Sequence, residues 1–401
     1  MTLGAAVSRV ETLERRYLNG TFTELCRIES PSGRERACAQ RVVAELRALG
    51  VSAEEDDAGA AAGSDCGNLL VRLPRGPAVR ESGLQQAGPR RSILLCAHLD
   101  TVPLQAPVEP VLVDGGWENS NDGILGADNK AAVAVLLALA RHVCRLGAPV
   151  DVELLFTVGE ELSLAGARAF EVSRLRSDFG YVFDHASPIG EVIVDSPTHF
   201  RLQVELGGSA AHAGIRPEEG RSAILAAARA IASMPLGRLD DHTTVNVGTI
   251  AGGTALNVVP ERCSFLAEVR SLEIERAEQV VAEIVDRVHE AANLPDCDCD
   301  VDIAVERTFS GYRLPSSSPA LAVAEAALRG CGYQPVRVAS GGGSDANALI
   351  AQGLPMVNLA NGTERNHEPG ERVSVAALEG MLDVALGLLD EAAALPPDAG
   401  L

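Results

Sequence analysis

The sequence predicts an α/β fold in which a mixed, mostly parallel sheet is sandwiched by helices, with an α+β domain inserted into the chain. Apolar runs of strand length alternate with helix-forming segments in the first half, as in a parallel sheet with crossover helices. From about residue 197 the order becomes strand, helix, strand, strand, helix, strand, which is the ferredoxin-like pattern. The α/β pattern returns after Tyr312. We therefore expect one domain in two parts, residues 1–196 and 311–401, around an inserted domain of residues 197–310.

The composition is that of an ordinary globular protein and argues against several kinds of partner. The chain has 401 residues, 46% apolar and 22% charged, which is enough for two domains. Acidic residues outnumber basic ones by 55 to 34, and the formal charge of −21 argues against nucleic acid and anionic membranes as partners. No apolar run approaches the roughly 20 residues of a membrane span, and no secretory signal pattern is visible. We expect a cytoplasmic protein whose nine scattered cysteines are reduced.

The N-terminal segment predicts two helices and a first strand. The turn Ser30–Gly33 separates the helices, and the second helix runs from about Gly33 to Leu49 with an apolar stripe. A strand is expected over Asn68–Leu73, followed by an exposed loop over residues 74–91.

The segment Ser92–Thr101 predicts a buried strand that ends in polar residues. Its unbroken apolar run is typical of a strand covered on both faces. His98 and Asp100 come at its end, where binding sites are built in parallel sheets. After a second loop, Asp128 directly precedes a helix expected over Ala131–Arg145. Taken alone, an aspartate at that place is explained as a helix cap.

The strand, polar end and helix pattern then repeats. Val152–Val158 predicts another buried strand, and Glu160 and Glu161 follow it. A helix is expected over Leu164–Leu175, and the strand after it ends at Asp184. The repetition indicates a site at the carboxyl edge of an α/β sheet.

The remaining elements complete the two domains. In the inserted domain, strands are expected over residues 200–206, 244–250, 262–270 and 301–306, and helices over 221–234 and 275–292. In the last part we expect helices over 319–329 and 375–394, strands over 336–339 and 356–359, and a Gly341–Asp345 loop that opens a helix. That glycine-rich loop suits close approach to a substrate backbone.

The polar element ends supply the groups that a dinuclear metal site requires. Two close metal ions make a water molecule acidic enough to attack a carbonyl carbon. Such a site needs about two histidines, several carboxylates, one carboxylate to accept a proton, and nearby hydrogen-bond donors. The residues that fit are His98, Asp128, Glu160, Glu161, Asp184 and His367. Asp100, two residues from His98, would orient the imidazole of His98.

These residues occur in motifs that resemble those of the M20 metallopeptidases, above all their peptidase T-like (tripeptide aminopeptidase-like) branch. The resemblance covers nearly the whole chain. The matching motifs are His98-Leu-Asp100-Thr-Val, Gly126-Ala-Asp128-Asn-Lys130, Gly159-Glu160-Glu161, Asp184, Gly207-Gly-Ser-Ala-Ala-His212-Ala-Gly, Thr254-Ala-Leu-Asn257-Val-Val-Pro260, Glu268-Val-Arg270-Ser, Gly341-Gly-Gly-Ser-Asp345-Ala-Asn and His367-Glu368. Asn129 departs from the pattern, because many relatives carry an acid there.

The resemblance implies a zinc-exopeptidase type of fold with two bound Zn²⁺ ions, Co²⁺ or Mn²⁺ being possible replacements. It implies that His98 and Asp184 hold one ion, that Glu161 and His367 hold the other, and that Asp128 bridges them. The two parts of the first domain would then form a catalytic domain, and the inserted domain would be a lid that forms a homodimer.

The resemblance also implies roles in catalysis and substrate binding. Glu160 would be the general base, with Asp100 supporting His98. His212 would hold the substrate carbonyl, commonly across the dimer. Residues expected to contact the substrate are Asn257, Arg270, Gly342, Gly343 and Ser344. The other histidines (142, 199, 242 and 289) are interpreted as structural or surface residues.

The implied activity is hydrolysis of an amide bond in short peptides with release of the N-terminal amino acid. An N-acyl or N-carbamoyl amino acid hydrolase is an alternative, because the catalytic groups recognise only the amide bond, whereas the surrounding pocket recognises the rest of the substrate. A remote alternative is a non-catalytic binding protein that keeps this fold.

Overall fold

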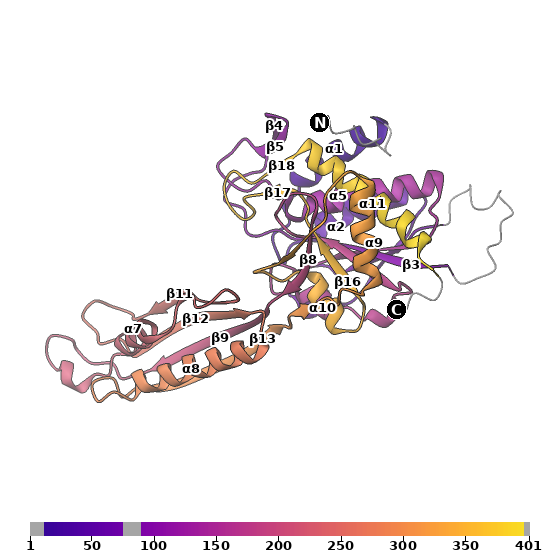
Figure 1. Ribbon diagram of the computed structural model, residues 1–401. Helices are drawn as coiled ribbons and strands as arrows, with labels where there is room; N and C mark the ends of the chain where they lie inside the picture. Colours follow the sequence, from indigo (N-terminus) through magenta and orange to yellow (C-terminus); the bar gives the residue numbers. More distant parts are fainter. Residues whose placement is uncertain (1–11, 75–89, 397–401) are drawn as a thin grey trace. The chain divides into compact units, whose positions relative to one another are not determined.

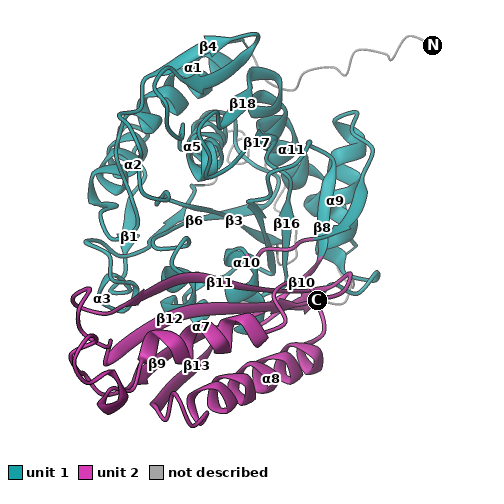
Figure 2. Ribbon diagram, turned by 90° about the vertical axis from the view of Figure 1, so that its left-hand side faces the viewer, with its two compact units in different colours: residues 1–194, 313–339, 344–401 teal, residues 195–312, 340–343 magenta. Residues whose placement is uncertain are grey.

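The computed structural model describes residues 12–74 and 90–396, which form two compact units (Figures 1 and 2). Unit 1 contains the described residues up to 194, residues 313–339 and those from 344 onward. Unit 2 contains residues 195–312 and 340–343. The short segment 340–343 thus packs with unit 2, whereas the sequence led us to expect it in the domain formed by residues 311–401. Most of the loop expected over residues 74–91 lies outside the described residues.

Unit 1 is built on a nine-stranded sheet whose centre is parallel. Its order is β1-β2-β6-β3-β7-β16-β8-β14, with β15 paired to β8. The four central strands β6, β3, β7 and β16 are parallel neighbours. The strand bounds are β1 Ala53–Glu55, β2 Leu69–Arg72, β3 Ser92–His98, β6 Asp151–Thr157, β7 Phe179–Phe183, β8 Glu191–Ser196, β14 Tyr312–Arg313, β15 Val336–Ala339 and β16 Met356–Leu359. This confirms the predicted mixed, mostly parallel sheet, and every residue of β3 is buried as expected.

Helices cover both faces of this sheet (Figure 2). The helices on one face are α1 Thr12–Cys26, α2 Arg36–Ala48, α5 Ala127–Leu146, α9 Pro319–Gly330 and α11 Val375–Ala394. Those on the other face are α3 Gly59–Ala62 and α10 Asp345–Ala351, and α6 Ala165–Ala169 contacts both of them. Helix α5 is apolar around its whole circumference from Ala131 to Ala140, and it lies in the middle of the core between the sheet and other helices.

Two sequence predictions in unit 1 were wrong. The loop expected before Gly126 contains a hairpin, β4 Pro110–Val113 and β5 Gly116–Asn119, which joins β18 Arg372–Ser374 and β17 Thr363–Glu364 in a four-stranded sheet. The helix expected over Leu164–Leu175 is only α6 and a 3₁₀ turn at Val172–Arg174, because Phe170 between them is extended.

Unit 2 has the predicted ferredoxin-like order. Its antiparallel sheet has the order β10-β11-β12-β9-β13, and helices α7 and α8 pack on one face (Figure 2). The bounds are β9 Thr198–Gly207, η2 Pro217–Glu219, α7 Ala223–Ser233, β10 Gly237–Arg238, β11 Thr243–Gly252, β12 Arg262–Ser271, α8 Ile274–Ala292 and β13 Asp300–Phe309. Alternate residues of β12, including Phe265 and Val269, face the helices and are buried.

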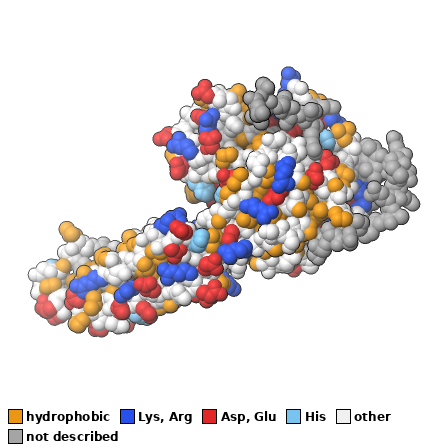
Figure 3. Space-filling model, viewed as in Figure 1, with side chains coloured by type: hydrophobic (Ala, Val, Ile, Leu, Met, Phe, Trp, Pro, Cys, Tyr) orange, Lys and Arg blue, Asp and Glu red, His pale blue; other side chains and the backbone are white. Residues whose placement is uncertain are grey.

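The two ends of unit 2 lie next to each other. The Gly311 N–H donates to Thr198 Oγ1 at 2.9 Å, and a Cβ at Gly311 would lie 2.5 Å from the Ser196 carbonyl oxygen, so only glycine fits there. At the surface, positive and negative side chains are interspersed over the face that carries α8 (Figure 3), where Arg287 lies between Glu283 and Glu290.

The nine cysteines are free thiols. Within residues 12–74 and 90–396, no helix combines the length and hydropathy needed to cross a lipid bilayer.

Candidate metal centre

The parallel strands of unit 1 bring polar side chains from distant parts of the chain to one sheet edge. His98 is the last residue of β3 and pairs with Thr157, the last residue of β6, shortly before Glu160 and Glu161. Asp184 follows β7 directly. Because the carboxyl ends of parallel strands meet at one edge, these side chains converge.

Asp128 lies between the two histidines of this cluster. Asp128 Oδ1 is 3.3 Å from His98 Nε2, and Asp128 Oδ2 is 3.3 Å from His367 Nε2. His98 Nε2 is also 3.8 Å from Asp184 Oδ1, and His367 Nε2 is 2.8 Å from Glu161 Oε1. The structure therefore brings together all six residues in which the sequence predicted metal or base chemistry, because Glu160 also lies within ligand distance of His98 and Asp184.

The cluster fits divalent metal ions. His98 Nε2, Asp128 Oδ1 and Glu161 Oε1 are buried and have no hydrogen-bond partner of acceptable geometry among the described residues. Ligand atoms of His98, Glu160 and Asp184 lie within 4.8 Å of one another, as do those of His98, Asp128 and Glu161. Buried polar atoms without partners are costly, so their convergence indicates a cation that would satisfy them.

Charge and burial perturb the titration of these groups. Burial raises the pKa of Glu160 well above its usual value, and the nearby Asp184 raises it further. The carboxylates of Asp128 and Glu161, which lie 3.3 and 2.8 Å from its Nε2, raise the pKa of His367 to about 10. Burial disfavours the charged form of His98, but its carboxylate neighbours outweigh burial and its pKa is raised. The surplus of carboxylates explains both histidine shifts and suits bound cations.

Asp100 contacts both the imidazole of His98 and the backbone of the turn that follows β6. His98 Nδ1 lies 3.0 Å from the Asp100 backbone oxygen and 3.4 Å from Asp100 Oδ1. The Asp100 carboxylate also accepts from the N–H groups of Glu160 at 3.0 Å and Glu161 at 3.1 Å, and from Ser32 Oγ at 2.7 Å. It therefore fixes the backbone of the turn that carries two acidic residues of the cluster.

Three other buried side chains hold the backbone beside proposed ligands, and the sequence did not reveal them. Glu35 accepts from the Gly159 N–H at 3.1 Å. Asn358 contacts both backbone groups of Asp184, at 3.1 Å and 3.0 Å. The third, Glu371, accepts a hydrogen bond from the backbone N–H of Asp128. Glu35 and Glu371 lie far from these contacts in the sequence, so no local spacing marks them.

Glu371 anchors the loop that presents Asp128. Its carboxylate accepts from the N–H groups of Leu125 at 2.8 Å, Gly126 at 2.7 Å and Asp128 at 2.9 Å. The side chain is buried, and burial raises its pKa to about 7 although the three N–H groups favour the ionised form. Asn366 holds the other end of Asp128, because its Nδ2 donates to Asp128 Oδ2 at 2.8 Å.

The expected substrate-binding residues fall mostly in unit 2. His212 forms an isolated bridge with Val258, and the Ala213 N–H donates to the Asn257 carbonyl at 3.0 Å, so His212 and Asn257 lie on adjoining loops. Arg270 Nη1 lies 3.5 Å from the Gly341 carbonyl oxygen, next to Gly342 and Gly343. Ser344 belongs to unit 1, where it caps α10.

Comparisons match this chain to two peptidase family models and to relatives that it covers almost entirely. The model of the M20 peptidase dimerisation domain matches residues 198–294, and that of peptidase family M28 matches residues 82–186. The uncharacterised protein YqjE of Bacillus subtilis is 34% identical, over 95% of this chain and 99% of its own length. The crystal structure of aminopeptidase PepT from Bacillus cereus matches with a TM-score of 0.79 and 33% identity, over 94% of this chain and 99% of that chain. A tripeptidase from Staphylococcus aureus gives a TM-score of 0.83 and 29% identity, over 95% and 99%.

Proposed function

The chain belongs to the M20 family of metal-dependent peptidases, in its peptidase T-like branch, and we propose that it releases the N-terminal amino acid from short peptides. The observation that carries this proposal is the cluster of two histidines and four carboxylates at the carboxyl edge of the sheet, in which three buried ligand atoms have no hydrogen-bond partner among the described residues. The PepT and tripeptidase relatives support short peptides as the substrate class.

We propose that the cluster holds two divalent ions, preferably Zn²⁺, with Co²⁺ or Mn²⁺ as replacements. His98 and Asp184 would hold one ion, and Glu161 and His367 the other, while Asp128 would bridge them. The opposite oxygens of Asp128 each lie 3.3 Å from a different histidine, which supports a bridging role. When bound, the ions would polarise the scissile carbonyl and lower the pKa of the attacking water.

Glu160 would accept the proton of that water and pass it to the leaving amine. Its carboxyl oxygen lies within 4.8 Å of ligand atoms of His98 and Asp184, and we assign it as the base and not as a metal ligand. Burial and the nearby Asp184 raise the pKa of Glu160, which makes the carboxylate a stronger proton acceptor. Asp100, which fixes the Glu160 backbone N–H, would keep this carboxyl in place.

In unit 2, His212 would donate a hydrogen bond to the oxygen of the scissile carbonyl. The Gly214 N–H donates to His212 Nδ1 at 3.2 Å, so Nδ1 acts as an acceptor and the ring proton sits on Nε2, from which it can be donated. Asn257 would hold the substrate backbone, together with Gly342, Gly343 and Ser344. Arg270 would bind the carboxylate at the substrate's C-terminus, a pairing that guanidinium geometry favours.

A substrate panel with the metal-loaded full chain tests this function. Tripeptides should be hydrolysed faster than N-acetyl or N-carbamoyl amino acids, and only N-terminally free peptides should release their first residue. Glu160→Gln should lower kcat at least about 100-fold, whereas the exposed Glu171→Gln serves as the matched control. Faster turnover of N-acyl amino acids would move the assignment to the amidohydrolase alternative, and undiminished turnover by Glu160→Gln would refute the proposed base.

We also propose that unit 2 forms a homodimer. Leu256 and Ile215 are large apolar residues with exposed fractions of 102% and 68%, beside Asn257 and His212. The match of residues 198–294 to a peptidase dimerisation domain supports unit 2 as the dimerising part of the chain. Sedimentation should give a dimer, and Leu256→Glu should shift it toward monomer. A fully active wild-type monomer would refute dimerisation as a requirement for activity.

A further inference from the structure

A chain of polar contacts crosses the sheet of unit 2 on the face opposite α7 and α8. Residues Phe265 and Val269 of β12 face the helices, so Glu268 and Arg270 point to the other side of the sheet. His199 of β9 is the register partner of Arg270, which makes His199 and Glu268 diagonal neighbours on that side.

Glu268 joins a histidine to an arginine through one oxygen. Glu268 Oε2 lies 3.0 Å from His199 Nε2 and 3.1 Å from Arg270 Nη2. The hydrogen bond from His199, with that from Arg270, lowers the pKa of Glu268 to about 2, so the carboxyl is ionised at neutral pH. An ionised carboxylate only accepts hydrogen bonds, and therefore both neighbours donate to it.

His199 is itself held rigidly. Its Nδ1 lies 2.5 Å from Thr308 Oγ1, and its ring stacks on Phe309 with centroids 5.2 Å apart at an interplanar angle of 24°. The residue is buried. A buried, stacked imidazole with partners on both nitrogens is held in one orientation. Its Nε2 therefore holds the Glu268 carboxylate at a fixed position.

The Arg270 guanidinium lies beside the glycine segment 341–343, and several of its N–H groups are available to bind a ligand. Among the described residues it hydrogen-bonds only to Glu268 and to the Gly341 carbonyl at 3.5 Å, and its side chain is 30% exposed. Two contacts leave several of its five N–H groups for a ligand. The segment is fixed as well, because Ser196 Oγ donates to the Gly342 carbonyl and a Cβ at Gly343 would lie 2.6 Å from the Phe309 ring.

We propose that His199 and Glu268 are positioning residues that set the Arg270 guanidinium for the C-terminal carboxylate of the substrate, and so determine the preference for peptides with a free C-terminus. The inference rests on the proposed function of Arg270. Without its neighbours, the long arginine side chain would lose rotamer entropy on binding.

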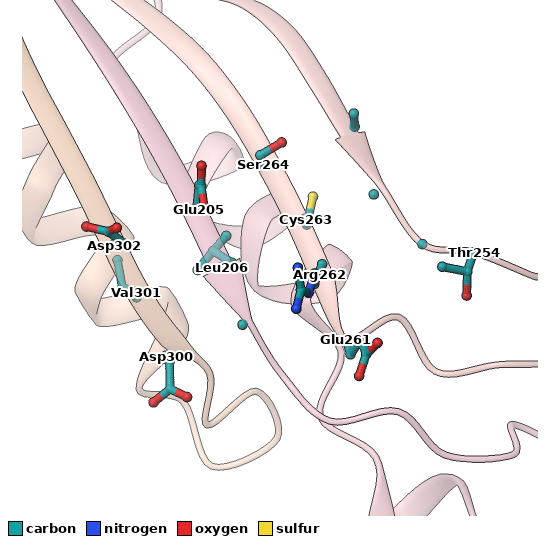
Figure 4. A pocket seen from close by; sticks show the side chains of 14 residues that line it. Glu205, Leu206, Thr254, Glu261, Arg262, Cys263, Ser264, Asp300, Val301 and Asp302 are labelled. Carbon is teal, nitrogen blue, oxygen red and sulfur yellow. The ribbon is translucent and has the colours of Figure 1, made fainter.

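The opposite end of the same sheet does not suit a carboxylate. A depression of about 720 Å³ lies there, where β9 and β11 end and β12 and β13 begin (Figure 4). Glu205, Glu261, Asp300 and Asp302 line it against the single Arg262, so its net charge would repel an anion. The Arg270 end is therefore the better carboxylate site, and Glu205 offers a control position on the same sheet.

The test compares a tripeptide with its C-terminal amide, using the metal-loaded full chain. Arg270→Ala should lower the acid-to-amide ratio of kcat/KM at least about tenfold, as expected for loss of a charge-assisted hydrogen bond. Glu268→Gln and His199→Gln should lower the same ratio about three- to tenfold through KM, with kcat within about twofold of wild type. Glu205→Gln, whose carboxylate hydrogen-bonds only to Gln203 among the described residues, should leave the ratio unchanged.

The outcomes separate the inference from the proposed function. If Arg270→Ala affects acid and amide equally, the proposed carboxylate contact fails. If Arg270→Ala is selective but Glu268→Gln and His199→Gln are not, the positioning role is overturned while the function stands. In an Arg270→Ala background, adding Glu268→Gln should change the ratio no further, and a further fall would overturn the inference. If Glu268→Gln does not fold, Glu268→Asp carries the test, with the same selective effect expected.

Discussion

Glu371 should control both the stability of unit 1 and its affinity for metal. The substitution Glu371→Gln keeps the size of the side chain but leaves one acceptor oxygen in place of two. One wild-type oxygen accepts from Leu125 and Gly126, and the other accepts from Asp128. In the variant, the amide NH₂ would face at least one buried N–H group.

The size of the effect follows from these contacts. A buried N–H group left without an acceptor costs about 1–3 kcal/mol, and loss of the charge weakens the remaining hydrogen bonds by roughly 1 kcal/mol. Because burial raises the side-chain pKa to about 7, the ionised carboxylate also carries a desolvation cost at pH 8 that Glu371→Gln removes, so we expect the free energy of unfolding to fall by only about 1–2 kcal/mol. Because the Asp128 backbone loses its anchor, the affinity for Zn²⁺ should also fall, by about 10–100-fold.

The chain contains its own fluorescent reporter of unfolding. Trp117 is the only tryptophan of the chain, and it pairs with Val373 of β18, two residues beyond Glu371, so its fluorescence reports unfolding of this region in urea. Glu368→Gln is the matched control, because that exposed glutamate makes only a 3.9 Å contact with Arg365. Metal affinity can be measured by competition with a chromophoric chelator. Stability within about 0.5 kcal/mol of wild type and unchanged zinc affinity would refute the anchoring role.

Three further predictions concern acid stability, packing and metal. Because the pKa of Glu268 is about 2 in the folded protein and near 4.3 in an unfolded chain, the unfolded state binds more protons between these values, and stability should fall as the pH drops from about 4.3 to 2. After allowance for solvent screening the loss is about 1 kcal/mol, and urea titrations at several pH values should show a flatter slope for Glu268→Gln; an equal slope would contradict this. Phe265→Ala should cost about 3–5 kcal/mol and its exposed neighbour Leu266→Ala less than about 1, measured by urea unfolding, and similar losses would contradict the assigned faces of the strand. Removing metal with a chelator should lower the melting temperature and adding Zn²⁺ should restore it, whereas Asp128→Asn should respond much less; an equal response would exclude Asp128 as a ligand.

The sequence was sufficient to predict the buried parallel strands and the cluster of polar residues at their ends. The run in Ser92–His98 has no polar interruption, and burial on both faces of a parallel strand demands that pattern. The hairpin of β4 and β5 was missed although a signal exists. Asp114 and Gly115 form its turn with φ of 46° and 74°, as an Asp-Gly hairpin turn requires.

The supporting side chains of the metal centre could not be predicted from the sequence. Glu371 and Leu125 are 246 residues apart, and a carboxylate that accepts backbone N–H groups leaves no periodic pattern. Glu35 looks like any polar residue near the start of a helix. The contact between His199 and Glu268 depends on strand register, which was not assigned in advance, and His199 was accordingly interpreted as a structural or surface residue.

The hydrogen bond between Gly311 and Thr198 bears on how this architecture could have arisen. A domain whose entry and exit points touch can be added to a host chain, or exchanged for another, with little disturbance of the host's own strands. The junction is therefore a single, compact attachment point for the inserted unit. Unit 2 could therefore change during evolution while the parallel sheet of unit 1 remained unchanged.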